Sequence, residues 1–396
     1  MICTGNSLRR STLMQTTNRH ATQSLRSDTT LIPDIAPSNT VSFRGDGEPK
    51  TPSTMLQSLA EFDQKFTLKE DAYSLGGTVE QLEKKCAEML GKEAAVFMPT
   101  GTLANHLAIR KLCGVKPRAI VQEQSHLYND SGDCVTRLSN INLIPLAKGG
   151  PYFTLETLKA AVEQAESGRV INPVGAVMVE SPVRRQLGKI MPFDEMKAVT
   201  DYCRVKQIGS HLDGARLYIM SGATGIPPAD YAALFDTVYV SLYKYFGAPF
   251  GAILVGTAEF MDGLYHDRRM FGGGLASANF AAALALQGID GFEERFNRAM
   301  TRARTLFDKI NALESISVEP FEHGSNIFPL KLESDIDGTR FVEVLKEHSV
   351  SVSPPEGDHA RRIMLTVNPT LLRQDIQDLF CAFERAIKES QQCPLV

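Results

Sequence analysis

Apolar residues recur along most of this 396-residue chain in two alternating spacings. Short apolar runs bounded by glycine, proline or polar residues predict strands, and apolar residues three and four positions apart predict helices. Strands are expected at residues 94–98, 119–122, 143–146, 175–179, 209–212, 237–241 and 252–255, and helices at 79–90, 102–113, 155–165 and 194–207. This alternation predicts an α/β fold in which a mostly parallel seven-stranded sheet lies between helices.

The pattern changes after Gly274. An alanine-rich helix over 276–287 precedes a long charged helix over 292–313, which we expect to link two domains. Strands at 326–332, 350–352 and 363–367 and helices over 338–348 and 371–388 then predict a small α+β domain. The expected partition is an N-terminal arm and a large domain over 41–290, followed by a small C-terminal domain over 291–396.

Residues 1–40 differ in composition from the rest of the chain. They are rich in Ser, Thr, Asn and Arg, contain no Lys, and hold only two acidic residues, Asp28 and Asp34. A stretch of this kind buries too little apolar surface to fold alone, so we expect a disordered tail. An acidic-poor, arginine-containing start is also typical of an organelle transit peptide, and that alternative stays open.

Composition excludes several classes of protein. The net charge of −4 provides no bulk attraction to nucleic acid or anionic membranes. No apolar run approaches the roughly 20 residues of a membrane span. The seven cysteines are scattered without a Cys-x-x-Cys pair, which argues against a disulfide framework and a structural zinc site. A reducing compartment, and so a cytoplasmic location, is expected.

Lys244 and Asp213 stand at the ends of two successive predicted strands. A lysine at a strand terminus is partly desolvated, which lowers its pKa and frees its amine to attack a carbonyl. An aspartate nearby can hold a heteroaromatic nitrogen protonated. Together they predict a pyridoxal 5′-phosphate site in the large domain, with Lys244 forming the Schiff base and Asp213 pairing with the ring nitrogen.

Other candidate residues fall at the same edge of the predicted sheet. Gly101 and Thr102 join a strand to a helix, whose N–H groups and dipole favour a phosphate, although an ordinary capped turn has the same pattern. His126 follows a strand and is a candidate for ring stacking or proton transfer, or for a structural hydrogen bond. Arg362 begins a strand of the small domain and is a candidate for bidentate binding of a substrate carboxylate, with Arg361 as the alternative.

Four segments resemble the threonine aldolases, which are grouped with the aromatic β-eliminating lyases among the aspartate-aminotransferase-like enzymes. They are residues 94–105, His211-Leu-Asp-Gly-Ala-Arg-Leu217, Lys244-Tyr-Phe-Gly-Ala-Pro-Phe-Gly251 and Arg268-Arg-Met-Phe-Gly-Gly-Gly274. The resemblance runs from about Arg44 to the C-terminal helix. It implies that Lys244 holds pyridoxal phosphate, Asp213 contacts the ring nitrogen, Gly101 and Thr102 bind the phosphate, and His126 stacks on the ring.

The same resemblance implies further roles. Arg216 and Arg362 are expected beside the ring hydroxyl and the substrate carboxylate. Arg268 is expected near the cofactor phosphate or a subunit boundary. The segment that ends at Tyr73 is expected to reach into a neighbouring subunit and contact the substrate there. The chain is therefore expected to form a homodimer or homotetramer and to act on a small amino acid.

The chain departs from the family pattern on the substrate side. Gly45 stands in place of a serine, Val183 in place of a histidine near the substrate hydroxyl, and Tyr243 in place of the serine before the lysine. Arg184 and Arg185 follow Val183 and indicate either a more acidic substrate or solvated loop arginines.

The implied activity is a carbon–carbon lyase reaction. An L-β-hydroxy-α-amino acid would be cleaved to glycine and an aldehyde, with His126 or a water as the base. β-Elimination to ammonia and a keto acid is the alternative on the same scaffold. A protein that keeps the fold but only binds, without turnover, is a third and more remote one.

Overall fold

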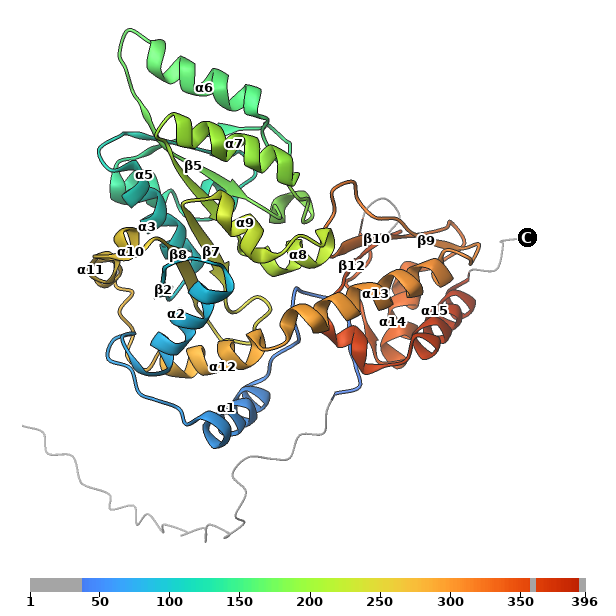
Figure 1. The fold of residues 1–396 in the computed structure, drawn as a ribbon. Coiled ribbons are helices and arrows are strands. Elements are labelled where there is room, and N and C mark those ends of the chain that lie inside the picture. Colours follow the sequence, from blue (N-terminus) through green and yellow to red (C-terminus); the bar gives the residue numbers. More distant parts are fainter. Residues whose placement is uncertain (1–37, 357–360, 392–396) are drawn as a thin grey trace, which may run out of the picture. The chain divides into compact units, whose positions relative to one another are not determined.

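A seven-stranded sheet forms the centre of the large domain in this computed structural model, which describes residues 38–356 and 361–391 (Figure 1). The strand order is β2-β8-β7-β6-β5-β3-β4, and β8 alone runs antiparallel to its neighbours. The strands are β2 (Ala94–Met98), β3 (Arg118–Gln122), β4 (Asn142–Leu146), β5 (Val174–Glu180), β6 (Gly209–Asp213), β7 (Thr237–Ser241) and β8 (Ala252–Gly256). The predicted mostly parallel sheet of seven strands is confirmed. The predicted tail lies outside the described residues as far as residue 37.

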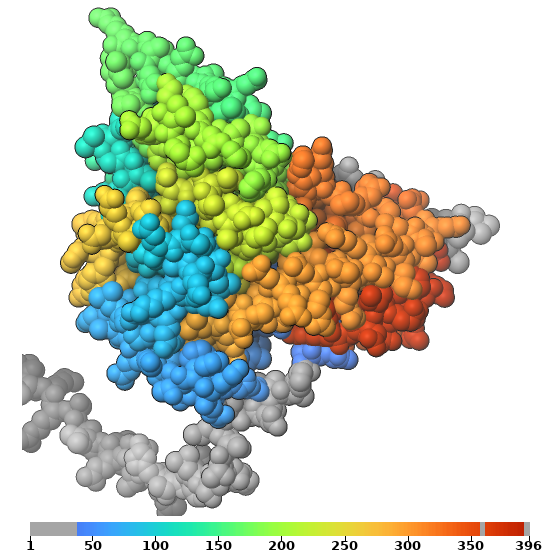
Figure 2. Space-filling view, in the orientation of Figure 1, coloured from blue at the N-terminus to red at the C-terminus, as the bar shows by residue number. Residues whose placement is uncertain are grey.

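Helices cover both faces of this sheet, and α1, α2 and α12 pack together, with α1 and α2 seen as the blue surface in Figure 2. The helices and short helical turns around the sheet are α1 (Pro52–Phe66), α2 (Gly77–Met89), α3 (Gly101–Cys113), α4 (His126–Asn129), α5 (Cys134–Ser139), α6 (Leu155–Ser167), η1 (Arg184–Gln186), α7 (Phe193–Val205), α8 (Leu217–Thr224), α9 (Pro228–Leu234), α10 (Ala258–Met261), α11 (Leu264–Met270) and α12 (Asn279–Ile289). Within residues 38–356 and 361–391, none of the helices combines the length and the hydrophobicity of a membrane span.

Alternation along the buried strands decides which side chains meet α3. In β8, Ala252 and Leu254 join the apolar cluster beneath α3, whereas Ile253 and Val255 join the cluster on the opposite face. Successive side chains of a strand point to opposite faces, so alternate residues of β5, β6 and β7 also face α3. The face of the sheet that packs on α3 and the carboxyl ends of β5, β6 and β7 therefore meet at the N-terminus of α3.

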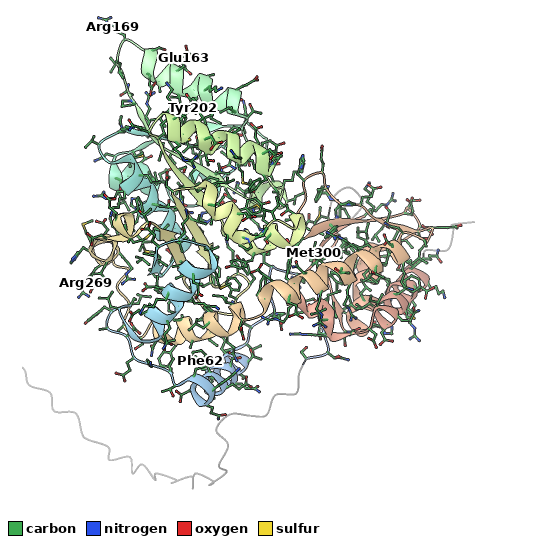
Figure 3. The ribbon with its side chains drawn as sticks, in the orientation of Figure 1. Phe62, Glu163, Arg169, Tyr202, Arg269 and Met300 are labelled. Atoms are coloured by element: carbon green, nitrogen blue, oxygen red, sulfur yellow. The ribbon has the colours of Figure 1, made fainter. Side chains whose placement is uncertain are left out.

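Helix α13 (Phe292–Ile310) connects the large sheet to the C-terminal elements. Its buried residues recur every three or four positions, and Met300, near the middle of the helix, is one of them (Figure 3). The helix packs against α8 and also against β9, η3 and α15. The C-terminal elements are β9 (Ile316–Val318), β10 (Ile327–Leu332), α14 (Gly338–Glu347), β11 (Val350–Ser351), β12 (Arg362–Thr366), η3 (Pro369–Arg373) and α15 (Ile376–Ser390). Strands β9, β10 and β12 form an antiparallel sheet.

The N-terminal strand β1 (Val41–Ser42) pairs with β11 of the C-terminal region. Phe43 packs edge-on against Phe383, with ring centroids 6.4 Å apart. The Asn368 amide donates hydrogen bonds to the carbonyl groups of Ser42 and Gly45, at 2.8 and 3.1 Å. The arm that leads toward the large domain thus starts on the small one.

The C-terminal helix expected over 371–388 is interrupted, and this part of the prediction is wrong. Gln374 has φ −127° and ψ 157°, an extended conformation that separates η3 from α15. The Asn368 side chain accepts the N–H of Thr370 and begins η3, and Asp375 precedes α15. Apolar periodicity continues across both pieces because both pack on one core, so it could not reveal the break.

Candidate active site

A cavity of about 490 Å³ lies where the carboxyl ends of β5, β6 and β7 meet the N-terminus of α3. Six of the predicted site residues line it: Gly101, Thr102, His126, Asp213, Arg216 and Lys244. Ligand sites in open α/β sheets form at this edge, so the location agrees with the topology.

The N-terminus of α3 faces the cavity with free backbone donors. Thr100 caps the helix, and its hydroxyl accepts the N–H of Leu103 at 3.1 Å. The N–H groups of Gly101 and Thr102 have no intrahelical acceptor, as in the first turn of any α-helix. Gly101 lies directly against the Tyr239 side chain, so a Cβ at this position would overlap the phenol. Glycine therefore allows Tyr239 and the helix N-terminus to form one wall of the cavity.

Asp213 is the carboxylate at the end of β6 and is only 2% exposed. Its Oδ2 accepts a hydrogen bond from Nδ2 of Asn105 at 2.6 Å, and its Oδ1 accepts the N–H of Ala215 at 3.1 Å. Oδ1 of Asn105 lies 2.9 Å from Nε2 of His211, and Nδ1 of His211 lies 2.8 Å from the hydroxyl of Thr237. A continuous chain of hydrogen bonds thus runs from Thr237 to Asp213.

The hydrogen-bond chain from Thr237 to Asp213 has one consistent arrangement of protons. Burial lowers the pKa of His211 to about 4, so the imidazole is neutral at physiological pH. Because the Asn105 amide nitrogen donates to Asp213, its oxygen accepts, and Nε2 of His211 must carry the proton. The Thr237 hydroxyl then donates to Nδ1. Asp213 thus has hydrogen-bond donors on one side and the cavity on the other.

Lys244 extends its amine into the cavity from the loop after β7. Burial, followed by the charge of Arg216, lowers the pKa of Lys244. The amine makes no hydrogen bond to a residue in the described part of the chain. Nζ of Lys50 donates to the carbonyl oxygens of Tyr243 and Ala248, which lie on either side of Lys244 in the sequence. These two hydrogen bonds hold the loop that carries Lys244 in place. The result is a positioned, partly desolvated nucleophile.

Arg216 is held by a carboxylate that comes from the N-terminal arm. Its Nε donates to Oδ2 of Asp46 at 2.7 Å, and the two side chains are only 9% and 12% exposed. Asp46 follows directly on the segment anchored by Asn368. The orientation of Arg216 therefore depends on both the arm and the small domain.

Glu180, at the end of β5, holds the backbone of two residues of the cavity wall, His126 and Arg184. It is 3% exposed, and its two oxygens accept the backbone N–H of His126 at 2.5 Å and of Arg184 at 3.0 Å. Burial, followed by the negative charge of Asp213, raises its pKa to about 7. The His126 ring approaches the hydroxyl of Ser131, with Nδ1 and Oγ 3.2 Å apart.

Only some of the residues at which the chain departs from the family pattern line the cavity. Val183 is fully buried and is not part of the cavity wall, whereas Arg184 and Tyr243 both line the cavity. Asn105 and Glu180 are site residues that the motifs alone did not identify. The sequence held one signal for Asn105: it is a polar residue among the apolar positions of the helix that begins at Gly101, one turn after that glycine.

Three predicted site residues lie outside the walls that the described residues form. Arg268 is completely buried, and it donates to the carbonyl groups of Phe97 at 2.6 Å and Ser74 at 3.1 Å. Tyr73 is 51% exposed and lies beneath the guanidinium of Arg269, which is labelled in Figure 3. Arg362 is exposed at the start of β12. Their roles toward cofactor and substrate stay predictions.

The residues present fit pyridoxal phosphate. The cavity offers an amine of lowered pKa at Lys244, a buried carboxylate at Asp213, and free N–H donors at Gly101 and Thr102. These groups match the aldehyde, the protonated ring nitrogen and the phosphate of that molecule in turn.

Known proteins are similar to this chain in sequence or in structure. The model of the β-eliminating lyase family matches residues 51–333. The low-specificity L-threonine aldolase of Candida albicans is 30% identical over 274 residues, which cover 68% of each chain. A Listeria monocytogenes protein provisionally named an L-allo-threonine aldolase has a solved structure that superposes with a TM-score of 0.74 at 27% identity, covering 88% of this chain and 96% of that one.

Proposed function

This chain belongs to the family of threonine aldolases and β-eliminating lyases, which are PLP-dependent lyases, and from that premise we propose that it cleaves L-β-hydroxy-α-amino acids to glycine and an aldehyde. The observation that carries the proposal is the meeting of Lys244, Asp213 and the α3 N-terminus in one cavity. Bound pyridoxal phosphate supplies an electron sink for the pair released when a bond to Cα breaks.

Each of these groups has a distinct task in the proposed reaction. Lys244 would hold the aldehyde carbon through Nζ and, once a substrate amine has taken its place, would lie free in the cavity to carry a proton to Cα. Asp213 would pair with the ring nitrogen and keep it protonated, and the hydrogen bonds from Asn105 and the Ala215 N–H would hold its side chain in place. The N–H groups of Gly101 and Thr102 would orient the phosphate.

Cleavage also needs a base for the β-hydroxyl proton. That proton leaves as the aldehyde C=O forms, the Cα–Cβ electron pair passes to Cα, and Cα then takes up a proton to give glycine. Val183 has no polar side-chain atom and is buried, so it cannot serve. His126 is our candidate base, because it lines the cavity and Glu180 fixes its backbone.

The product pair tests this proposal directly. Purified, PLP-loaded protein would be incubated with L-threonine, L-allo-threonine, L-phenylserine and L-serine, while glycine, aldehyde, ammonia and keto acid are quantified in parallel. Glycine and aldehyde in equal amounts are expected. Ammonia with keto acid would instead assign β-elimination, the alternative reaction, after which the matching family is named. Absence of both pairs would favour the binding protein without turnover.

We also propose that the chain assembles as a homodimer or homotetramer. Large apolar side chains are exposed on two segments that hydrogen-bond to each other, through Ser74 to Leu275 and through Asn279 to Asp71; they are Tyr73, Leu75, Met270 and Phe280. Exposed apolar patches of this kind mark interfaces between proteins. Light scattering coupled to size-exclusion chromatography would give the molar mass, and a monomer at micromolar concentration would overturn the proposal.

A further inference from the structure

We propose that Arg184 binds an anionic group on the Cβ substituent of the substrate, so that the preferred substrates are acidic β-hydroxy-α-amino acids; this inference rests on the proposed aldol cleavage. Arg184 lines the same cavity as Lys244 and Asp213.

The backbone at Arg184 is held at a defined point of the cavity wall. Its N–H donates to Oε1 of the buried Glu180 at 3.0 Å. The preceding residue, Val183, is fully buried, and its N–H donates to the carbonyl of Lys189 at 2.8 Å. A guanidinium that rises from an anchored backbone loses less freedom on binding a ligand than one on a mobile loop.

The charge of Arg184 is not neutralised within the described part of the chain. Arg216 is paired with Asp46 at 2.7 Å, and the neighbouring Arg185 is paired with Asp130 at 2.9 Å. Arg184 forms no ion pair among residues 38–356 and 361–391. Arg184 lines the cavity and is exposed to solvent, so its guanidinium is accessible to a carboxylate, which it can bind with two parallel hydrogen bonds.

The position of Arg184 relative to His126 indicates which part of the substrate it meets. The backbone N–H groups of both residues bind the two oxygens of one carboxylate, Glu180, so the two residues start from adjacent points of the wall. If His126 takes the proton from the β-hydroxyl, Arg184 stands on the Cβ side of the substrate. Its ligand there is the group carried by Cβ.

The chemistry of such a substrate is balanced without a further reactant. In 3-hydroxyaspartate the hydroxyl proton leaves, the Cα–Cβ bond breaks, and the Cβ fragment becomes glyoxylate. The other fragment takes up one proton at Cα and becomes glycine. Arg184 would hold the carboxylate that ends in glyoxylate.

Steady-state kinetics on two substrates tests the assignment. We would measure kcat/KM for L-3-hydroxyaspartate and L-threonine with the wild-type protein, Arg184→Gln and the matched control Arg185→Gln. A charge-assisted hydrogen bond predicts a loss of about 10- to 100-fold for hydroxyaspartate in Arg184→Gln, with threonine within about twofold. Arg185→Gln is expected to change neither. Equal losses on both substrates would assign Arg184 to the α-carboxylate, and no loss on either would make it a solvated arginine; both outcomes overturn the proposal.

A binding experiment separates this inference from the proposed activity. L-Aspartate and L-2-aminobutyrate lack the β-hydroxyl and cannot undergo the aldol cleavage, so their affinities are measurable by isothermal titration of the PLP-loaded protein. Arg184→Gln is expected to weaken aspartate binding about tenfold or more and to leave 2-aminobutyrate unchanged. If Arg184→Gln selectively loses aspartate binding and the wild-type protein cleaves no β-hydroxy-amino acid, the aldolase activity is rejected and the anion site at Arg184 is supported. If the protein cleaves threonine but Arg184→Gln shows no selective loss, the activity is supported and the anion site is rejected.

Discussion

Replacing Asn105 with leucine tests the hydrogen-bond chain beneath Asp213. Leucine has a similar size but removes the Nδ2 donor to Asp213, at 2.6 Å, and the Oδ1 acceptor for His211, at 2.9 Å. Both partners are buried, so water does not replace the lost bonds. We therefore expect the cofactor-free protein to lose substantial stability.

The magnitude follows from the two bonds. A hydrogen bond to a charged group contributes about 1.5–3 kcal/mol, and a buried donor left without an acceptor costs about 1–3 kcal/mol. Part of this is offset by the added apolar burial of leucine, which leaves a net loss of about 2–5 kcal/mol. Bound pyridoxal phosphate would give Asp213 a donor through its ring nitrogen in both proteins, and this donor would compensate Asp213 more in the variant, where the Asn105 donor is missing. The loss in the loaded protein should then fall to about 1–3 kcal/mol, the part that belongs to His211.

Urea unfolding followed by circular dichroism, with and without pyridoxal phosphate, measures both values. Asn326→Leu is the matched control, because Asn326 is also fully buried and donates from Nδ2 to the carbonyl of Val367 at 2.9 Å, but lies outside the cavity wall. The control should lose the same stability in both conditions. If Asn105→Leu also loses the same amount with and without the cofactor, the ring nitrogen does not compensate Asp213 for the lost Asn105 donor.

Three further predictions concern other groups of the site. Lys244→Ala should retain no pyridoxal phosphate absorbance after dialysis and should form no product, and turnover at the wild-type rate would exclude Lys244 from the reaction. Because burial raises the pKa of Glu180 from 4.5 to about 7, the native protein holds a proton that the unfolded chain releases, and this group makes stability fall as pH rises from about 4.5 to 7. Glu180→Gln should remove that component from melting temperatures measured across this range, and an unchanged pH slope would argue against a raised pKa. Asp46→Asn should lower the free energy of unfolding by about 3–5 kcal/mol, since Arg216 is left buried and unpaired, whereas Glu389→Gln, on the surface, should cost less than about 1 kcal/mol. Equal losses in these two variants would show that the Arg216 pair is solvated.

The apolar pattern predicted the sheet well but not the direction of every strand. Buried strands such as β5 are continuous apolar runs, and glycines and polar residues bound them, so their number and positions could be predicted. The run over β8 is equally apolar, yet this strand is antiparallel. Its direction depends on the connection from β7, which carries Lys244, and apolar periodicity contains no information on strand direction.

Residues at strand ends were the easiest part of the site to predict. Asp213 and Lys244 follow neighbouring parallel strands, whose carboxyl ends must share one edge of the sheet, so their convergence follows from the α/β pattern. Asn105 was missed because its partners, Asp213 and His211, are more than 100 residues away in the sequence. The contribution of a helix residue to a site depends on how the helix crosses the sheet.

The sequence by itself determined the fold class, the family and the groups that match pyridoxal phosphate, because each depends on local patterns: apolar spacing, a strand that ends on a charged residue, and glycine before a helix. Only the tertiary structure decided which of two adjacent arginines lines the cavity, since Arg185 finds Asp130 while Arg184 does not. Only it brought Asp46 to Arg216 across 170 positions, through an arm that begins on the small domain. Side-chain partners of this kind are set by packing between distant segments, and no local pattern encodes that packing.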